Sequence, residues 1–256
     1  MMGRDPLRVA VLASWRADGL DGLFGSDGRW EVVAGVVTEP GSSAARLLDG
    51  RGVPRMLRDL RGFCLRRGVP LLDSDARRAF DTLTATRLRI FRPDLIVLCG
   101  YNYRLSEPFL ACWPDRIINI HDADLRIRRD NGGPGYSGLR SVRDAICAGE
   151  AETRSTVHLV IPEIDAGPPL VVSGPYPVSL PADVRTSGDG IGTYAAVHRE
   201  QMIRDCWGPL LRAAVELFSE ERVEVMANGR VLIGGRPAPL VLSPKAAPVT
   251  ALQEVA

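Results

Sequence analysis

Short apolar runs rich in branched residues alternate along the chain with longer segments whose apolar residues recur at helical spacing. The runs that predict buried strands cover residues 7–13, 30–37, 70–72, 95–99, 117–120 and 156–161. The segments that predict helices cover residues 43–48, 54–67, 75–91 and 138–148. Alternation of this kind is typical of βαβ units, so we expect an α/β fold: a Rossmann-like three-layer sandwich with a mostly parallel sheet.

The pattern changes after Pro177. A loop rich in Pro, Gly and Ser over residues 180–190 precedes a long segment of helical period, residues 191–218, which predicts a helix packed on the sheet. Two apolar runs then flank Asn228 and Gly229, a pair that suits a hairpin turn, and predict a C-terminal β-hairpin over residues 222–226 and 231–233. From Ser243 onward no helical or strand period is found, so we expect one domain over residues 1–243 and a flexible tail over residues 244–256.

Length and composition narrow the class of partner. The 256 residues suffice for one sizeable core, and a formal net charge of +1 favours a small-molecule partner over nucleic acid or a membrane. The apolar run at residues 7–13 is too short to span a bilayer. Five cysteines without a C-x-x-C pair favour neither a disulfide framework nor a metal site, so we expect a cytoplasmic protein that needs no metal. Nothing in the sequence defines the oligomeric state.

Two polar residues end the apolar strand at residues 117–120. Asn119 and His121 are spaced i, i+2, which places both on one face of the strand near its carboxyl end. Carboxyl ends of parallel strands are where open α/β sheets bind ligands. Taken alone, this pair is more typical of a core histidine beside a turn residue than of a ligand site.

A second strand brings another histidine and then a carboxylate. His158 lies within the run at residues 156–161, and Asp165 follows in a loop just before Ala166 and Gly167. An isolated loop aspartate is most simply a turn residue or a helix cap.

Together these pieces resemble the glycinamide ribonucleotide transformylase and methionyl-tRNA formyltransferase superfamily. In that family an N-x-H strand end and a downstream D-x-G-P-type loop carry the catalytic residues. The stretch from Arg92 to Tyr101, the residues Leu105, Ser106 and Phe109, and the segment from Gly138 to Gly149 continue the family pattern. The resemblance runs weakly from Leu7 and strongly between Pro93 and Pro168.

The resemblance implies transfer of a formyl group from 10-formyltetrahydrofolate to an amine through a tetrahedral intermediate. It implies Asn119 and His121 as donors to the oxygen that becomes negative, with Asp165 fixing the charge state of His121 or holding a water, and His158 in support. The implied folate pocket comprises Tyr103, Leu105, Ile161, Glu163, Ile164 and Asp165.

The chain departs from the family where an acceptor would bind. The phosphate-cradling glycine loop of the purine enzymes is replaced by Ser14-Trp15-Arg16, so phosphate binding there would have to depend on Arg16. The usual Pro-Ser after the histidine is replaced by Asp122 to Leu125, and a polar insertion, Arg126 to Gly133, follows. We expect the acceptor amine to be bound by Asp122, Asp124, Arg126, Tyr136 and Arg16. A solvated charged loop is the equally weighted alternative.

The sequence therefore supports several possible functions, which we rank by how well the residues fit each one. First is a formyltransferase acting on a small amine or hydroxylamine, with glycinamide ribonucleotide as an alternative acceptor. A tRNA acceptor is not expected, because the chain is not basic and nothing like the tRNA enzyme's extra domain follows Pro239. A formyltetrahydrofolate hydrolase ranks lower, because no regulatory domain like that of the deformylases precedes the site. A non-catalytic Rossmann-like binding module ranks last, because no G-x-G-x-x-G follows the first strand.

Overall fold

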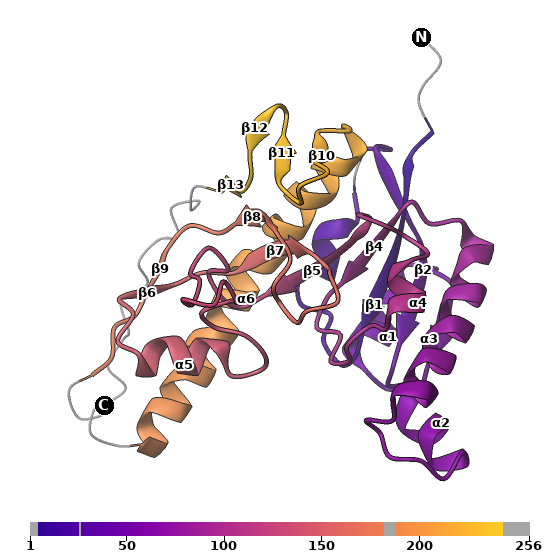
Figure 1. Cartoon of the computed structure of the whole chain (residues 1–256), viewed down its shortest axis with the longest axis horizontal. Coiled ribbons are helices and arrows are strands. Elements are labelled where there is room, and N and C mark those ends of the chain that lie inside the picture. The colour runs from indigo at the N-terminus through magenta and orange to yellow at the C-terminus, as the bar shows by residue number, and fades with distance from the viewer. Residues whose placement is uncertain (1–4, 26, 182–187, 243–256) are drawn as a thin grey trace.

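An eight-stranded sheet forms the centre of the computed structural model, which describes residues 5–25, 27–181 and 188–242 (Figure 1). Its strands in chain order are β1 (Leu7–Ala13), β2 (Trp30–Val37), β3 (Arg55–Leu57), β4 (Leu95–Leu98), β5 (Ile117–His121), β7 (Thr156–Leu159), β8 (Pro169–Val172) and β13 (Leu240–Val241). They lie in the order β13-β8-β7-β5-β4-β1-β2-β3. Only β7 runs antiparallel to its neighbours, so the sheet is mostly parallel, as predicted.

The strand order reverses between β1 and β4. From β1 the chain moves outward to β2 and β3, whereas β4 is followed on its other side by β5. Connections that leave two neighbouring strands in opposite directions open a crevice at their carboxyl ends. That crevice lies beside the end of β5, where the polar residues of the N-x-H strand are.

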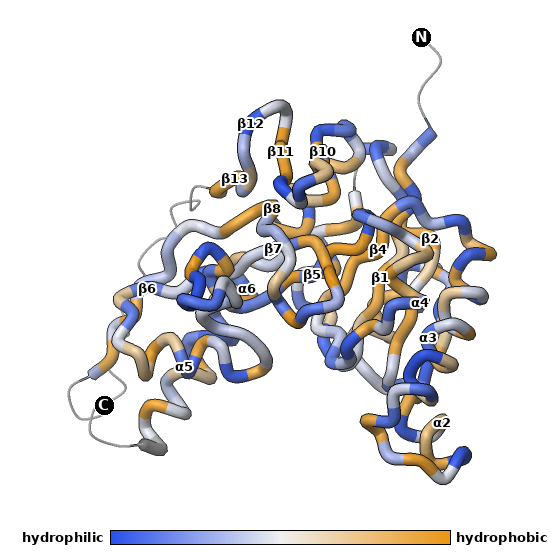
Figure 2. Tube along the Cα trace, in the orientation of Figure 1, coloured by the Kyte–Doolittle hydropathy of each residue, from blue (hydrophilic) through white to orange (hydrophobic). Residues whose placement is uncertain are grey.

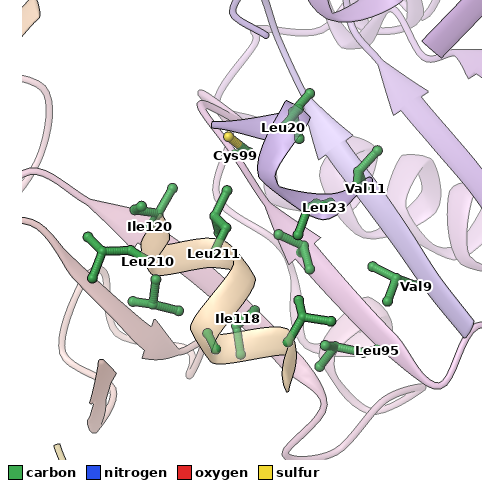
Figure 3. Close-up of a cluster of buried hydrophobic side chains, with 14 of the residues drawn as sticks. Val9, Val11, Leu20, Leu23, Leu95, Cys99, Ile118, Ile120, Leu210 and Leu211 are labelled. Carbon is green, nitrogen blue, oxygen red and sulfur yellow. The ribbon is translucent and has the colours of Figure 1, made fainter. Parts of the chain in front are cut away.

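Helices cover both faces of the sheet, which confirms the three-layer architecture. The helices described are η1 (Leu20–Leu23), α1 (Ser43–Gly50), α2 (Leu60–Arg66), α3 (Ser74–Leu88), η2 (Arg89–Phe91), α4 (Glu107–Leu110), α5 (Ser141–Cys147) and α6 (Gly188–Ser219). Of these, α2 packs on α3 and α5 packs on α6. Alternate residues of β1 face opposite layers: Val9 and Val11 pack with η1, α1 and α6, while Ala10 and Leu12 pack with α3 and α4. Figure 3 shows the first of these clusters, with Leu210 and Leu211 of α6 against Ile118 and Ile120.

Hydropathy along the trace follows this layering. Figure 2 shows apolar stretches along β1 and β4 inside the sheet and hydrophilic positions on the outer turns of α3. Strands covered on both faces read as continuous apolar runs, which is why the central strands were predictable from the sequence. No helix among the described residues is long and apolar enough to cross a membrane.

Two small sheets complete the described fold. Strands β10 (Val223–Val225), β11 (Val231–Ile233) and β12 (Arg236–Pro237) form an antiparallel sheet, which confirms the predicted hairpin. Gly229 has a φ of 79° in the turn, the conformation for which an Asn-Gly pair is suited. Strands β6 (Glu152–Thr153) and β9 (Tyr176–Pro177) pair near the start of α6.

The prediction between β2 and α3 was wrong in one respect. Residues 70–72 form a turn rather than a strand, and Leu72 is 93% exposed. The third strand is instead β3, inside the segment predicted as the helix at residues 54–67. That helix begins only at Leu60, because the side chain of Asp59 accepts a hydrogen bond from the Gly62 amide and caps it.

Other boundaries also shifted. The strand predicted at residues 156–161 ends at Leu159 and runs antiparallel, and β8 and β13 were not anticipated because each is short. The long helix begins at Gly188 instead of residue 191. Part of the predicted loop, residues 182–187, and the predicted tail at residues 244–256 lie outside the described residues.

One close crossing fixes α6 against the β1 end of the sheet. A side chain at Gly22 would overlap the backbone carbonyl of Gly208, and a Cβ at Gly19 would lie 2.7 Å from the Cβ of Trp207. The short helix η1 therefore approaches α6 at a distance that only glycine permits.

Candidate active site

The antiparallel pairing of β5 and β7 brings Asn119 and His158 together. The two residues are register partners, and their side chains meet with 3.1 Å between Asn119 Nδ2 and His158 Nε2. His121 is the next residue of β5 on the same face, so one strand end presents both polar groups. The structure thus places the predicted supporting histidine against the predicted amide donor.

The environment of His158 defines its protonation. Its side chain is 3% exposed, and this burial, with His121 nearby, lowers its pKa to about 4, so the ring is neutral near pH 7. Its Nδ1 donates to the Leu159 carbonyl over 2.8 Å, which leaves Nε2 as an acceptor for the Asn119 amide. Asn119 is thereby oriented with its nitrogen toward His158, and its second N–H is left for another acceptor.

His121 and Asp165 face each other across the same site. The distance from His121 Nε2 to Asp165 Oδ2 is 3.6 Å, and Asp165 Oδ1 lies 3.9 Å from His158 Nε2. His121 Nε2 is buried and has no hydrogen-bond partner among the described residues. A buried polar atom of this kind is expected to meet a ligand, so the imidazole is positioned to act on one.

The loop that carries Asp165 has little freedom. Asp165 has a φ of 54°, and its Oδ2 accepts a hydrogen bond of 2.9 Å from the Gly138 amide. Two residues later, a side chain at Gly167 would overlap the Leu159 carbonyl oxygen of β7. The loop therefore folds back onto β7 closely enough to require glycine, and this contact fixes the carboxylate relative to both histidines.

These side chains line a cavity of about 280 Å³. All four predicted catalytic residues border it, as do the predicted folate-pocket residues Tyr103, Leu105, Ile161, Glu163 and Ile164. A larger cavity of about 880 Å³ adjoins it and shares residues 102–105, Leu139 and Pro162 with it. The fold thus brings the loop with Tyr103 and Leu105 and the loop at residues 161–165 to one cavity, and the sequence had predicted both loops as part of one pocket.

The predicted acceptor residues are less closely gathered. Asp122 borders the smaller cavity but is 4% exposed, and its carboxylate accepts from Trp207 Nε1 at 2.7 Å and pairs with Arg199 Nε at 2.8 Å. Arg16 is held by Glu200 and Asp18. Tyr136 donates to Glu150 over 2.7 Å, and burial together with this carboxylate raises the pKa of the phenol to about 12. Neither Arg16 nor Tyr136 borders either cavity.

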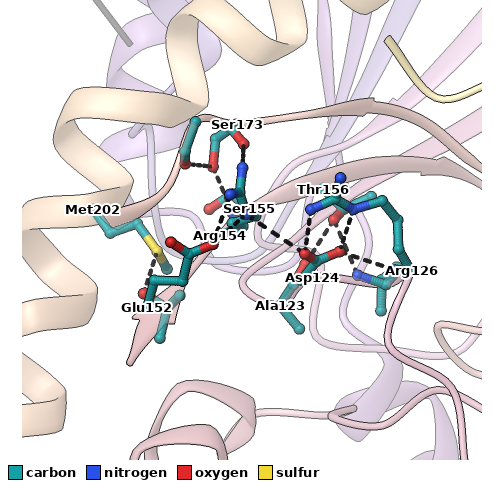
Figure 4. A network of polar contacts seen from close by, with 12 residues as sticks. Ala123, Asp124, Arg126, Glu152, Arg154, Ser155, Thr156, Ser173 and Met202 are labelled. Atoms are coloured by element: carbon teal, nitrogen blue, oxygen red, sulfur yellow. Dashed lines mark hydrogen bonds and ion pairs between the residues drawn. The ribbon is translucent and has the colours of Figure 1, made fainter. Parts of the chain in front are cut away.

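Asp124 and Arg126 form a network of their own, drawn in Figure 4. Asp124 accepts from Arg126 Nε at 2.8 Å and lies 3.6 Å from Arg154, and neither predicted residue borders a cavity. Burial alone would raise the pKa of Asp124, but the hydrogen bonds from Arg126 outweigh it and the pKa is lowered. The network anchors the start of the polar insertion to the strand that follows it. The binding roles of these residues remain predictions.

Sequence reasoning missed the contribution of α6. Arg199 and Trp207 border the smaller cavity, where they hold Asp122, and Leu139 and Ser141 complete the wall near Asp165. The helical period predicted which residues of α6 are buried, but it carries no information on which strand end they meet. Within the described ranges no group of three or more His, Cys, Asp or Glu side chains could hold a metal ion.

Comparison with known proteins agrees with this geometry. Residues 9–179 match the family model described as formyl transferase. The chain is 35% identical over 183 residues to the methionyl-tRNA formyltransferase of Roseiflexus sp. (strain RS-1), covering 71% of this chain and 50% of that one. It is 29% identical over 165 residues to the phosphoribosylglycinamide formyltransferase of Escherichia coli (strain K12), covering 64% of this chain and 68% of that one. The chain spans about half the length of the methionyl-tRNA formyltransferases it matches.

Solved structures share the fold. Glycinamide ribonucleotide transformylase 1 from Symbiobacterium toebii superposes with a TM-score of 0.68 at 24% identity, covering 90% of this chain and 95% of that one. A formyltetrahydrofolate deformylase from Pseudomonas syringae pv. tomato superposes with a TM-score of 0.66 at 21% identity, covering 89% and 66%. Because the family model matches residues 9–179, two thirds of the length, the chain belongs to the formyl transferase family.

Proposed function

We propose that this protein transfers the formyl group of 10-formyltetrahydrofolate to the primary amine of a small molecule. The amine nitrogen forms a bond to the formyl carbon, the bond from that carbon to N10 breaks, and one proton passes from the amine to N10. The products are an N-formyl compound and tetrahydrofolate. The observation that carries the proposal is the buried Nε2 of His121, without a partner among the described residues, beside Asn119 and Asp165 in one cavity.

Two donors are available for the oxygen that becomes negative. The second N–H of Asn119 is left over after its bond to His158, and His121 Nε2 supplies the other. Donors that are already oriented stabilise a developing oxyanion without reorganisation, and one such donor commonly contributes about a hundredfold to a thousandfold in rate.

Proton movement falls to His121 and Asp165. The attacking amine must lose a proton as the tetrahedral intermediate forms, and the leaving N10 must gain one as it collapses. His121 Nε2 lies 3.6 Å from the Asp165 carboxylate and both groups border the cavity, so the pair can take the proton from the amine and return it to N10. His158 stays neutral and keeps Asn119 oriented.

The two adjoining cavities suit the shape and charge of a reduced folate. The smaller one has the loops at residues 100–105 and 161–165 for the ring system near the catalytic groups. The larger one is bordered by Arg61, Arg77 and Arg78. Arg77 pairs with Asp81 and Arg78 with Glu107, so Arg61 is the cation of these three that best matches a carboxylate at the glutamate end of folate. The family name and the methionyl-tRNA and phosphoribosylglycinamide relatives support a formyl donor of this kind.

One experiment identifies the acceptor and distinguishes formyl transfer from hydrolysis of the formyl donor. Purified protein is incubated with 10-formyltetrahydrofolate carrying a labelled formyl carbon, with and without a panel of primary amines and hydroxylamine. We expect the label in an N-formyl product in amounts equal to tetrahydrofolate released, and little release without an amine. Release of labelled formate at the same rate in every tube would instead identify a hydrolase.

A further inference from the structure

An ion-pair network, which we call the acceptor wall, reaches one side of the smaller cavity and extends behind it. It comprises Arg16 and Asp18 after β1, Asp122 after β5, and Arg199 and Glu200 on α6. Arg199 and Asp122 border the cavity directly. Arg16 lies next to Gly100, which borders the cavity. A Cβ added at Gly100 would lie 3.7 Å from the Cβ of Arg16. The wall therefore stands in the crevice between the carboxyl ends of β1 and β4.

Each of the three nitrogen atoms of the Arg16 guanidinium already donates to a carboxylate. Its Nη1 donates to Glu200 Oε1 over 2.6 Å, its Nη2 donates to Glu200 Oε2, and its Nε donates to Asp18 Oδ2 over 3.0 Å. The hydrogen bonds to Glu200 raise the pKa of Arg16, and the same contact lowers the pKa of Glu200, so both stay charged near neutral pH. The cation on which phosphate binding in this loop would have to depend is already bidentately bound.

The second arginine of the wall is also occupied. Arg199 Nε pairs with Asp122 Oδ2 at 2.8 Å, and its Nη1 lies 3.9 Å from Glu200. Three carboxylates thus face two guanidinium groups within the wall. Asp21 and Arg204, the nearest further charges on Cys99 and Glu200, cancel each other and leave this excess of negative charge in place.

Part of the loop after β1 is already engaged within the protein. The hydroxyl of Ser14 accepts a hydrogen bond from the Asn102 backbone amide, and the Ser14 amide donates to the Gly100 carbonyl. The Ala17 amide donates to Ser43 Oγ. The amides of Ser14 and Ala17 are therefore not available to a phosphate oxygen.

We infer that the acceptor wall selects an amine whose non-reacting part carries no phosphate group, with Asp18 and Glu200 as the specificity-determining residues. This inference rests on the proposed function. A phosphate at the wall would meet an excess of carboxylates and find both arginines paired, and like charges brought together at a binding site oppose association. A neutral acceptor needs none of these ion pairs to break.

Glucosamine and glucosamine 6-phosphate test the inference as a matched pair of amines that differ only in the phosphate. N-formyl product is measured by mass spectrometry at saturating 10-formyltetrahydrofolate. We expect kcat/KM to favour glucosamine by about tenfold or more, because only the phosphorylated amine brings negative charge toward the carboxylates of the wall. In the double variant Asp18→Asn with Glu200→Gln, which frees Arg16, this preference should largely disappear. Equal use of both amines by the unmodified protein, or preference for the phosphorylated one, would overturn the inference.

A binding measurement decides the matter even if neither sugar is formylated. Inorganic phosphate is titrated into the protein and followed by calorimetry, with and without a 5-deaza folate analogue. Phosphate should bind the double variant and not the unmodified protein, and tighter binding to the unmodified protein would refute the inference. Asp49→Asn is the matched control, because Asp49 also binds an arginine, Arg55, but borders neither cavity. Failure of the folate analogue to bind would count against the proposed function and leave the phosphate result independent of it.

Discussion

The two sides of the cavity that we propose as the active site are held together by different means. On the transfer side, Asn119 and His158 are placed by the hydrogen-bond register of β5 and β7, and Asp165 is placed by backbone contacts at Gly138 and Gly167. On the acceptor side, residues from β1, β5 and α6 are held by ion pairs between side chains.

The difference explains where the family pattern persists in this chain. Backbone register is insensitive to most side-chain changes, so a motif held by register keeps its geometry while its surroundings change. A wall held by side-chain pairs changes its chemistry with each substitution. The acceptor side is accordingly where this sequence departs from the family pattern, and four predictions test the contrast.

The largest effect should come from the transfer side. His121→Ala or Asn119→Ala should each lower kcat by about a hundredfold to a thousandfold, because each removes a donor aimed at the developing oxyanion. Asp165→Asn combined with Asn119→Ala should lose much less than the product of the two single losses, because residues that act as one unit are not additive. His158→Ala should cost less than His121→Ala.

Folate affinity provides the control for these variants. Calorimetry with a 5-deaza folate analogue should give nearly unchanged binding to His121→Ala, since the donor acts in the transition state. Near-normal turnover by His121→Ala on its true substrate pair would show that the transfer side has been wrongly identified.

Gly167→Ala should break the backbone placement of Asp165. The added methyl group overlaps the Leu159 carbonyl, so the loop or β7 must move, and we expect a loss of about 2–3 kcal/mol in unfolding free energy together with slower turnover. Denaturant titration measures the first and steady-state kinetics the second. Gly41→Ala is the matched control, because a Cβ there meets nothing within 4 Å, and its stability should stay within experimental error.

Asp122 and Asp124 sharpen the comparison on the acceptor side. Asp122→Asn leaves an acceptor for Trp207 but removes the charge that pairs with Arg199, so we expect a loss of about 1–2 kcal/mol and weaker acceptor use with folate binding intact. Asp124→Asn should cost less, under about 1 kcal/mol, because its partner Arg126 is 38% exposed and Asp124 is less buried than Asp122. Equal effects of the two substitutions on acceptor KM would mean that the insertion also reaches the substrate.

The fourth prediction concerns the pH dependence of stability. Burial lowers the pKa of His158 from 6.5 to about 4 in the folded state, so the unfolded state binds more protons between these values. His158 therefore contributes stability that is fully present above about pH 6.5 and is lost as the pH falls toward 4. Urea titrations at several pH values across this range give the unfolding free energy as a function of pH. The slope of that free energy against pH should be shallower for His158→Gln than for the unmodified protein. Some slope should remain, because burial also lowers the pKa of His198.

Much of the fold and part of the site could be predicted from the sequence for one physical reason. Strands buried on both faces leave continuous apolar runs, and an i, i+2 pair at such a strand end marks a ligand-facing position, as Asn119 and His121 show. Short or edge strands such as β3 and β13 bury too little surface to leave that signal. Arg199 could not be anticipated, because its role depends on how α6 crosses β5, and Arg16 was predicted without the partner that occupies it.

The glycine crossing between η1 and α6 has a consequence for anyone who redesigns this protein for another amine. Gly22 and Gly208 bring the backbones of η1 and α6 into direct contact. The loop after β1 and the part of α6 that carries Arg199 and Glu200 are therefore held rigidly relative to each other. Libraries that randomise Asp18, Arg199 and Glu200 can therefore explore new acceptor chemistry on a scaffold that keeps its shape. Libraries that also randomise either glycine would contain mainly variants that cannot form this contact. Functional clones recovered from them should therefore retain both glycines.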